Sequence, residues 1–306
     1  MRGDSDLYLV WLEWPEKCFR VDESSLSYLK SIVPAASKVV RAKTRAGFLR
    51  SLSRATHVIT WYFDPKWFEL SPKLKLWATP SAGRELLPET APPGVVLHFG
   101  GFHGAIIAET VVGFMLAWCR GFFAARSFPG SRSGESPRVW LSSRCRTLAG
   151  SNAVIAGCGK IGSAVAAVLR SLSCEVEGFT RKNISGLSKA AEKCDWFIMA
   201  LPSTTGTDGF LSASLIRKLP KKCVVINVGR GNSIDENALL EALSKKKIAG
   251  AYLDVAKIEP LESFDSFVGV DPKRIPENLV LMPHSSAFSP DYLKSCFKEL
   301  KDEKLI

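Results

Sequence analysis

Three residues that can perform acid–base and carboxylate chemistry follow strand-like apolar runs in the second half of the sequence. They are Arg230, Glu259 and His284. In a parallel sheet, ligands gather at the carboxyl ends of the strands. We therefore expect these three side chains to lie in one site.

Together the three residue types fit hydride transfer to a 2-keto acid. An arginine can clamp the carboxylate and polarise the ketone, and a histidine can give the carbonyl oxygen its proton. A neighbouring carboxylate would keep the pKa of that histidine from falling in an apolar cleft. Taken alone, such an arginine is more often a surface residue, such a glutamate a loop carboxylate and such a histidine structural. We expect the other histidines, His57, His98 and His103, to be structural.

A glycine-rich turn predicts the element that binds the cofactor. The apolar run 153–156 ends in Gly157-Cys158-Gly159-Lys160-Ile161-Gly162, and a helical apolar pattern follows at once. Gly157 permits the tight turn, Gly159 lets the backbone approach a pyrophosphate, and Gly162 lets the helix pack close to its strand. The free amides at the start of the helix then face the anion. In this context the pattern indicates dinucleotide binding rather than a simple strand–helix turn.

The end of the next predicted strand, 175–179, bears on the choice of cofactor. An Asp or Glu there would bind the ribose 2′-hydroxyl of NAD, but the strand runs into Thr180, Arg181 and Lys182. A hydroxyl and an arginine favour a 2′-phosphate. We expect NADP, with NAD as the open alternative if Arg181 and Lys182 are ordinary surface charges.

Strands alternate with helices along the whole chain, which predicts an α/β protein with parallel sheets. One helix is expected over 24–32, capped by Ser24 or Ser25. At 306 residues and 46% hydrophobic composition, the chain can form two domains.

Composition excludes several other classes. The net charge of +11 is scattered rather than gathered in one helix or stripe, so no nucleic-acid partner is expected. The eight cysteines form no C-x-x-C pair, so we expect neither a metal nor disulfides. No signal peptide or membrane span is recognisable, and the expected location is the cytoplasm.

Several segments resemble the D-isomer-specific 2-hydroxyacid dehydrogenase family. The resemblance extends from about residue 56 onward and is strongest over 149–284. The matching pieces are Ser-Ala-Gly (81–83), Ile-Ala-Glu (107–109), the glycine turn, Leu-Pro-Ser-Thr-Thr-Gly-Thr (201–207), Ile-Asn-Val-Gly-Arg-Gly (226–231), Asp-Glu-Asn-Ala-Leu-Leu-Glu-Ala-Leu (235–243), Ala-Gly-Ala-Tyr-Leu-Asp-Val (249–255), Ile-Glu-Pro-Leu (258–261) and Pro-His (283–284).

The resemblance implies two doubly wound parallel-sheet domains. A Rossmann cofactor domain, 102–284, would be inserted in a flavodoxin-like substrate domain, 1–101 plus 285–306, with the active site in the cleft between them. The family is commonly homodimeric, with the helix predicted over 105–122 in the interface. Intramolecular packing of that helix explains its apolar residues equally well.

The resemblance also implies roles for individual residues. Arg230, Glu259 and His284 match the catalytic residues of the family, and Arg230 also anchors the substrate carboxylate. The amides of Ser81, Ala82 and Gly83 receive that carboxylate. The cofactor contacts fall on Gly157, Gly159, Lys160, Ile161, Gly162, Thr180, Arg181, Pro202, Thr207, Val228 and Asp254.

Two departures from the family affect the expected substrate. After His284 the family usually has a small, often glycine-containing segment, whereas this chain has Ser285-Ser286-Ala287-Phe288. Phe288 could alter the pocket. Arg84, beside the carboxylate loop, could add positive charge or point into solvent.

The leading hypothesis is an NADP-linked reductase of a small 2-keto acid, with glyoxylate or hydroxypyruvate expected. Two alternatives remain open from the sequence. One is an NAD-linked dehydrogenase of another acid such as D-lactate, and the other is a non-catalytic dinucleotide-sensing protein.

Overall fold

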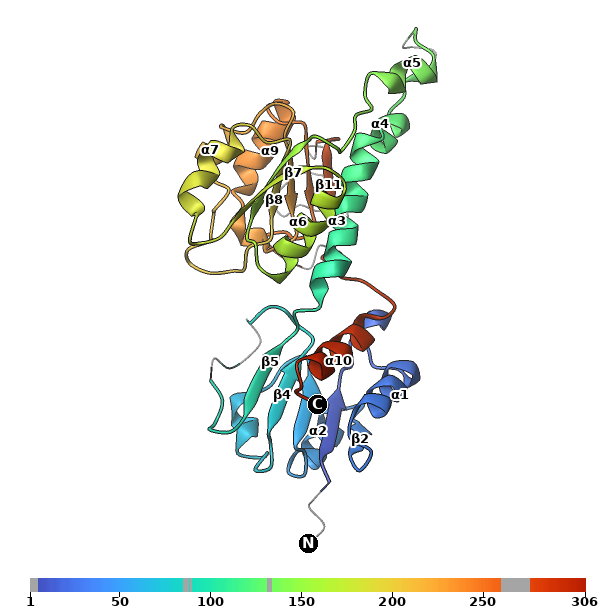
Figure 1. Ribbon diagram of the computed structural model, residues 1–306, viewed down its shortest axis with the longest axis vertical. Helices are drawn as coiled ribbons and strands as arrows, with labels where there is room; N and C mark the ends of the chain where they lie inside the picture. The colour runs from blue at the N-terminus through green and yellow to red at the C-terminus, as the bar shows by residue number, and fades with distance from the viewer. Residues whose placement is uncertain (1–4, 85–87, 89, 131–133, 260–275) are drawn as a thin grey trace. The chain divides into compact units, whose positions relative to one another are not determined.

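The computed structural model describes residues 5–84, 88, 90–130, 134–259 and 276–306. Its chain divides into two compact units. Unit 1 comprises Met1–His103 and Phe288–Ile306, and unit 2 comprises Gly104–Ala287. Unit 2 is thus inserted in the sequence of unit 1, and each unit contains its own parallel sheet (Figure 1).

Unit 1 is a five-stranded parallel sheet in the order β2-β1-β3-β4-β5. This is a doubly wound order with its switch point between β1 and β3. The strands are β1 (Leu7–Trp11), β2 (Lys38–Arg41), β3 (His57–Thr60), β4 (Leu76–Thr79) and β5 (Val96–Phe99). The helices are η1 (Lys17–Phe19), α1 (Glu23–Ile32), α2 (Arg45–Leu52), η2 (Pro65–Phe68) and α10 (Tyr292–Asp302).

Helices cover both faces of this sheet. Helix α2 lies on one face, where Phe48 and Leu52 pack against Leu9, Val58 and Trp77. On the other face α1 packs beside the C-terminal helix α10 (Figure 1). The end of the chain therefore returns to complete the core of unit 1.

Helix α1 is capped differently from the prediction. Its N-cap is Asp22, whose carboxylate accepts from the Ser25 amide at 2.8 Å. Ser25 is the N3 residue, and its hydroxyl accepts from the Asp22 amide at 3.0 Å. The predicted N-cap at Ser24 or Ser25 is therefore wrong. Asp22, which precedes both serines, is the N-cap and forms a reciprocal capping box with Ser25.

Unit 2 has a six-stranded parallel sheet in the order β11-β10-β9-β8-β6-β7. Its strands are β6 (Asn152–Ala156), β7 (Glu175–Phe179), β8 (Trp196–Met199), β9 (Val224–Asn227), β10 (Gly250–Leu253) and β11 (Leu279–Leu281). Its helices are α3 (His103–Cys119), α4 (Phe122–Arg126), α5 (Pro137–Ser142), α6 (Lys160–Ser171), η4 (Ile184–Gly186), α7 (Leu187–Ala191), α8 (Ala213–Ile216), η5 (Gly231–Ser233) and α9 (Glu236–Ser244).

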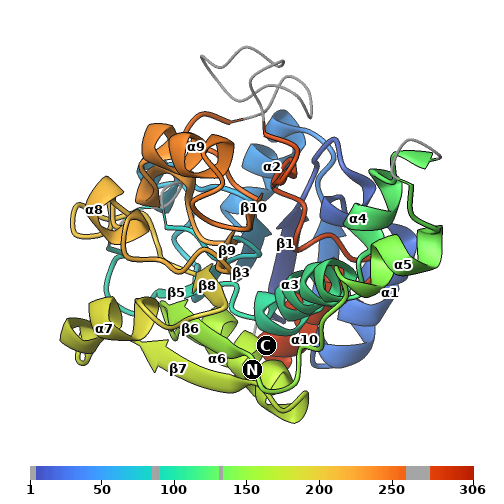
Figure 2. The same cartoon turned by 90° about the horizontal axis from the view of Figure 1, so that it is seen from above.

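Strand residues alternate between two cores, one on each face of this sheet. Side chains such as Ile155 and Trp196 face α3 and α6, whereas Val154 and Phe197 face α7, α8 and α9. Both faces are apolar because helices cover both, as in other doubly wound sheets (Figure 2). The α/β class with two parallel sheets is therefore confirmed.

The sheet of unit 2 departs from the common order of six-stranded dinucleotide-binding sheets, because only one strand, β7, lies beyond β6 on that side of the switch point. Counted within the unit, its strands run 2-1-3-4-5-6, whereas the common order is 3-2-1-4-5-6. The segment 180–195, which joins β7 to β8, forms only η4 and α7. The switch point, where ligands bind in such sheets, lies between β6 and β8.

Two further observations concern the classes excluded by composition. No helix within the described residues is long and apolar enough to cross a membrane. In the same part of the chain, no three His, Cys, Asp or Glu side chains form a group that could hold a metal ion.

Candidate active site

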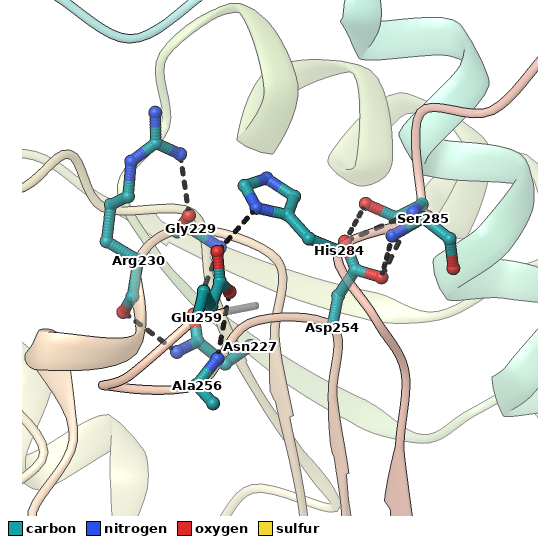
Figure 3. A network of polar contacts seen from close by, with 9 residues as sticks. Asn227, Gly229, Arg230, Asp254, Ala256, Glu259, His284 and Ser285 are labelled. Carbon is teal, nitrogen blue, oxygen red and sulfur yellow. Dashed lines mark hydrogen bonds and ion pairs between the residues drawn. The ribbon is translucent and has the colours of Figure 1, made fainter. Parts of the chain in front are cut away.

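Arg230, Glu259 and His284 come together at the carboxyl edge of the sheet in unit 2 (Figure 3). Arg230 follows β9, Glu259 lies after β10, and His284 follows β11. These three strands are neighbours in the order of the sheet. Parallel pairing therefore brings together residues that are up to 54 positions apart in the sequence.

His284 and Glu259 form a direct pair. Nδ1 of His284 lies 2.9 Å from Oε2 of Glu259, and the two side chains are 50% and 32% exposed. The hydrogen bond and the charge of Glu259 raise the pKa of His284, against the opposing effect of burial. Burial raises the pKa of Glu259, but His284 and the Ala256 amide outweigh it, so that pKa lies below its ordinary value.

The loop that carries Arg230 is fixed by buried polar groups. The Asn227 amide group donates to the Arg230 carbonyl at 3.0 Å, and its own oxygen accepts from the Gly229 amide at 3.0 Å. The hydroxyl of Ser233 also donates to the Arg230 carbonyl, at 2.6 Å. Asn227 and Ser233 have no exposed surface. The Arg230 guanidinium donates to the Gly229 carbonyl at 2.9 Å, and its charge lowers the pKa of Glu259.

The turn that carries His284 is held by Asp254, which is 1% exposed. The carboxylate of Asp254 accepts from the Ser285 amide at 2.9 Å and from the Ser286 amide at 3.0 Å. The Ser286 hydroxyl donates to the same carboxylate. His284 itself has a φ of 54°, a left-handed conformation that costs a non-glycine residue energy. Asp254 thus holds the catalytic candidate in a strained turn.

The second oxygen of the Glu259 carboxylate is held by the backbone of the turn that precedes it. Oε1 of Glu259 accepts from the Ala256 amide at 3.1 Å. The next amide, that of Lys257, donates to Glu236 of α9 at 2.7 Å. Two carboxylates therefore shape the turn 256–259. Pro260 and Leu261 of the matching segment lie outside the described residues.

The glycine turn has the geometry that the sequence predicts. Gly157 has a φ of 98°, and a Cβ there would lie 2.5 Å from the Ala200 carbonyl oxygen. A Cβ on Gly162 would lie 2.1 Å from the Gly157 oxygen, so the close approach of helix and strand requires glycine. A Cβ on Gly159, the N-cap of α6, would meet no atom of the described residues within 4 Å. The space above the start of the helix, beside Lys160 and Ile161, is open to a ligand.

The corner after β7 is organised by Asn183. Its side-chain oxygen accepts from the Thr180 amide at 2.7 Å and from the Thr180 hydroxyl at 3.2 Å. Its nitrogen donates to the Gly178 carbonyl at 3.0 Å. Arg181 and Lys182 are exposed, and the segment 180–183 includes no acidic residue. The two cations can therefore receive an anion from solution.

The remaining predicted cofactor residues lie beyond β8 and β9. The Thr207 hydroxyl donates to the Pro202 carbonyl at 2.6 Å and closes the loop 202–207. Val228 is buried, and its amide donates to the Met199 carbonyl at 3.0 Å. The loop 202–207 follows β8, which flanks the switch point, and Val228 follows the neighbouring strand β9, so all three residues lie on the ligand-binding edge of the sheet.

The predicted carboxylate loop lies in unit 1, directly after β4. The Ser81 amide donates to the Thr79 hydroxyl at 3.2 Å, and the Gly83 amide donates to the Ser81 hydroxyl at 3.2 Å. Both bonds are long, and Ala82 between them is exposed. The guanidinium of Arg84 lies 4.5 Å from the centre of the Phe99 ring, so it stacks on the strand next to the loop.

Sequence reasoning missed Asn227, Ser233 and Ser286, whose role is to hold the site residues in place. Asn227 carried a signal, because it stands in the matching segment 226–231. The three remaining histidines are buried, as expected for structural residues. His98 contacts Glu299 of α10 and Glu303, the residue that caps this helix, at 3.3 Å each, and His103 contacts Tyr292 at 2.8 Å.

Comparison with known proteins decides the family. The profile of the D-isomer specific 2-hydroxyacid dehydrogenase, NAD binding domain, matches residues 112–286. The chain belongs to this family. A curated relative, glyoxylate/hydroxypyruvate reductase A HPR2 of Arabidopsis thaliana, is 28% identical over 186 residues. That match covers 58% of the present chain and 56% of the Arabidopsis relative, so it spans little more than half of either chain.

Solved structures of the family share the whole fold. The D-isomer specific 2-hydroxyacid dehydrogenase of Xanthobacter autotrophicus Py2, in complex with NADPH and MES, is 23% identical with a TM-score of 0.75. It covers 96% of this chain, and the alignment takes in 92% of that structure. The NAD-complexed enzyme of Lactobacillus delbrueckii ssp. bulgaricus is 17% identical with a TM-score of 0.73, over 98% and 96% of the two chains. At these identities the likeness concerns the fold alone.

Proposed function

We propose that this protein is an NADPH-dependent reductase of 2-keto acids, with glyoxylate and hydroxypyruvate among its substrates. The observation that carries the proposal is the 2.9 Å pair of His284 and Glu259 beside Arg230. A dinucleotide-sensing protein needs no such pair, and this favours an enzyme over a sensor. When bound, the reduced nicotinamide would supply the hydride for the ketone carbon.

His284 is the proposed proton donor. Glu259 engages Nδ1, which leaves Nε2 as the nitrogen that can give a proton to the ketone oxygen. The raised pKa of His284 keeps the imidazole protonated nearer neutral pH, as an acid catalyst requires. In the oxidising direction the neutral imidazole would accept the same proton.

Arg230 is the proposed anchor for the substrate. Its guanidinium can bind the carboxylate in a bidentate manner and polarise the neighbouring carbonyl. The amides of Ser81, Ala82 and Gly83 are proposed to bind the same carboxylate. The present hydrogen bonds of the Ser81 and Gly83 amides to hydroxyl groups are long, whereas a bond to a carboxylate is charge-assisted and stronger.

The cofactor is proposed to bind across the switch point of unit 2. Gly157, Gly159 and Gly162 give its pyrophosphate access to the amides that begin α6. The preference for NADPH is supported by the exposed Arg181 in a segment, 180–183, without an acidic residue. Names of relatives do not decide this preference, since structures of the family have been solved with NADPH and with NAD.

We also propose a homodimer that uses α3 and the segment after it. Phe114 and Met115 are buried within unit 2, so these residues need no partner. Leu116 is 39% exposed, Phe122 of α4 is 65% exposed and Val139 of α5 is 54% exposed. Helices α4 and α5 extend away from the sheet of their own unit (Figure 1). These exposed apolar side chains support a contact with a second copy.

Oxidation of NADPH by the purified protein in the presence of glyoxylate or hydroxypyruvate tests the proposal. We expect turnover that falls by about 100-fold or more in His284→Ala and in Arg230→Ala, while NADPH binding measured by fluorescence stays nearly unchanged. Arg217→Ala removes an exposed arginine elsewhere in unit 2 and serves as the matched control. Unchanged turnover in His284→Ala or in Arg230→Ala would refute the assigned roles.

A further inference from the structure

Five aromatic side chains form a cluster in unit 1, which we name the aromatic wall: Trp14, Phe19, Trp61, Phe288 and Tyr292. Phe19 lies at its centre, with its ring 5.5 Å from Trp61, 5.1 Å from Phe288 and 4.6 Å from Tyr292, centroid to centroid. Trp14 extends the cluster and lies 5.5 Å from Trp61. These pairs are tilted or edge-to-face, and edge-to-face contact is an arrangement that aromatic rings prefer.

The wall stands at the ligand-binding edge of the sheet. Trp14 follows β1 by three residues and Trp61 follows β3 directly. These strands are neighbours, and the switch point of unit 1 lies between them. The side chains after β1 and β3 therefore occupy the position where a doubly wound sheet takes its ligand.

The wall is incompletely covered. Tyr292 is 3% exposed and anchors the cluster to α10, whereas Trp14 and Phe288 are each 43% exposed. A single exposed aromatic residue is ordinary. Here ring contacts through Trp61 and Phe19 join the two exposed rings in one cluster, and exposed apolar groups gathered in this way can mark a ligand-binding site.

Hydrogen bonds connect the wall to the carboxylate loop. The Thr79 hydroxyl donates to the Trp61 carbonyl at 3.1 Å and accepts from the Ser81 amide at 3.2 Å. The Tyr292 hydroxyl donates to the Pro80 carbonyl at 3.4 Å. The aromatic wall and the carboxylate loop 81–83 therefore lie at the same edge of the unit 1 sheet. A molecule whose carboxylate is held by 81–83 would lie beside the wall.

We propose that the aromatic wall binds the side chain of the substrate and makes the protein selective for 2-keto acids with an aromatic side chain. This inference rests on the proposed function, because it assumes that the protein reduces 2-keto acids and that the amides of 81–83 hold the carboxylate. A planar ring would pack on Trp14, Trp61 and Phe288 and exclude water from them. Glyoxylate has no side chain that could use this surface.

Steady-state kinetics with NADPH and three acids tests the inference: phenylpyruvate, the branched aliphatic 4-methyl-2-oxopentanoate, and glyoxylate. We expect kcat/KM for phenylpyruvate to exceed the values for both other acids by about 10-fold or more. Phe288→Ala and Trp14→Ala should each lower kcat/KM for phenylpyruvate about 10-fold and change that for glyoxylate less than about twofold. Leu70→Ala removes a similarly exposed apolar side chain of unit 1 and should change neither value.

The outcomes separate this inference from the function on which it rests. If no 2-keto acid is reduced, including glyoxylate, the proposed function itself is wrong. If glyoxylate or the branched acid is reduced as efficiently as phenylpyruvate, the selectivity of the wall is refuted and the reductase remains. An equal loss of kcat/KM for all three acids in Phe288→Ala would also refute the selectivity of the wall. Unfolding midpoints equal to that of the wild type would show that the variants are folded.

Discussion

The conformation of His284 shows how individual residues determine the chemistry of the site. Its left-handed backbone is maintained by Asp254, which binds the two following amides and the Ser286 hydroxyl. The Ser286 carbonyl in turn accepts from Thr110 of α3 at 3.0 Å. Ser286 therefore links the turn of His284 both to Asp254 and to α3. The imidazole can therefore meet Glu259 with little loss of side-chain entropy.

The pair of His284 and Glu259 makes the pH dependence of reduction testable. The protonated imidazole is the proposed acid, so kcat/KM for reduction should be full below the pKa of His284 and fall as the pH rises through it. That pKa is raised above its ordinary 6.5, mainly by Glu259. In Glu259→Gln the midpoint of the profile should move to lower pH.

Glu236→Gln is the matched control for the pH profile. Glu236 binds the Lys257 amide rather than the His284 imidazole, so this variant should keep the midpoint of the wild type. A midpoint that is the same in Glu259→Gln and in the wild type would show that another group titrates.

The corner at Arg181 makes the cofactor preference testable. Arg181→Asp replaces the proposed phosphate-binding cation with a carboxylate that repels a 2′-phosphate and accepts the ribose hydroxyls of NADH. We expect KM for NADPH to rise about 10-fold or more and KM for NADH to stay the same or fall. Lys189→Asp makes the same change of charge on the exposed surface of α7 and should affect both cofactors little. Equal effects of Arg181→Asp on the two cofactors would refute the 2′-phosphate role.

At the scale of elements, the strands and the glycine turn could be predicted because their signals are local. The apolar run 153–156 lies within β6 and the predicted strand 175–179 coincides with β7, while Gly157 makes the expected tight turn and Gly162 permits the expected close packing. The hydrogen bonds between Asp254 and Ser286 could not be predicted in the same way. It joins residues 32 positions apart and exists only because β10 and β11 are neighbours. The short helices α4, α5 and α7 carry too few turns for a periodic pattern.

The capping box of α1 gives a test of stability at this scale. Asp22→Ala removes the acceptor of the Ser25 amide and should lower the free energy of unfolding of unit 1 by about 1 kcal/mol. The hydroxyl and amide of Ser25 hold the pKa of Asp22 below its ordinary 3.8. The stabilisation is therefore present at neutral pH and is lost as the pH falls through that lowered pKa.

Chemical denaturation of the wild type and of Asp22→Ala measures this effect. Asp22→Asn keeps an acceptor for the Ser25 amide and should retain most of the stability of the wild type at neutral pH. A loss in Asp22→Asn as large as in Asp22→Ala would show that capping is not the cause.

At the scale of the whole molecule, the exposed apolar side chains of α3, α4 and α5 lead to a prediction about assembly. Phe122→Glu combined with Leu116→Gln should convert the proposed dimer to a monomer, because a charge at the centre of an apolar interface is left without a partner. Light scattering after size-exclusion chromatography measures the mass. Val168→Glu alters an exposed apolar residue on α6 and should leave the dimer intact. A wild-type protein that is monomeric at micromolar concentration would contradict the proposal.

The fold of the whole molecule was the most predictable feature, since alternating strands and helices imply parallel sheets. The insertion of one unit in the sequence of the other came from the resemblance to the family rather than from local patterns, because no local signal pairs α10 with unit 1. The absence of a strand between β7 and β8 was not predicted as a departure from the common order. It becomes visible only when the order of the strands is known.

The central claim is that this protein passes hydride from a nicotinamide to the carbonyl carbon of a 2-keto acid, with His284 as proton donor. Its most direct test is the reduction of hydroxypyruvate with NADPH that carries deuterium on both positions of nicotinamide C4. We expect D-glycerate with one deuterium on C2, formed by the wild type and at least about 100-fold more slowly by His284→Ala. A product without deuterium, the L-isomer, or an equal rate in the variant would contradict the account.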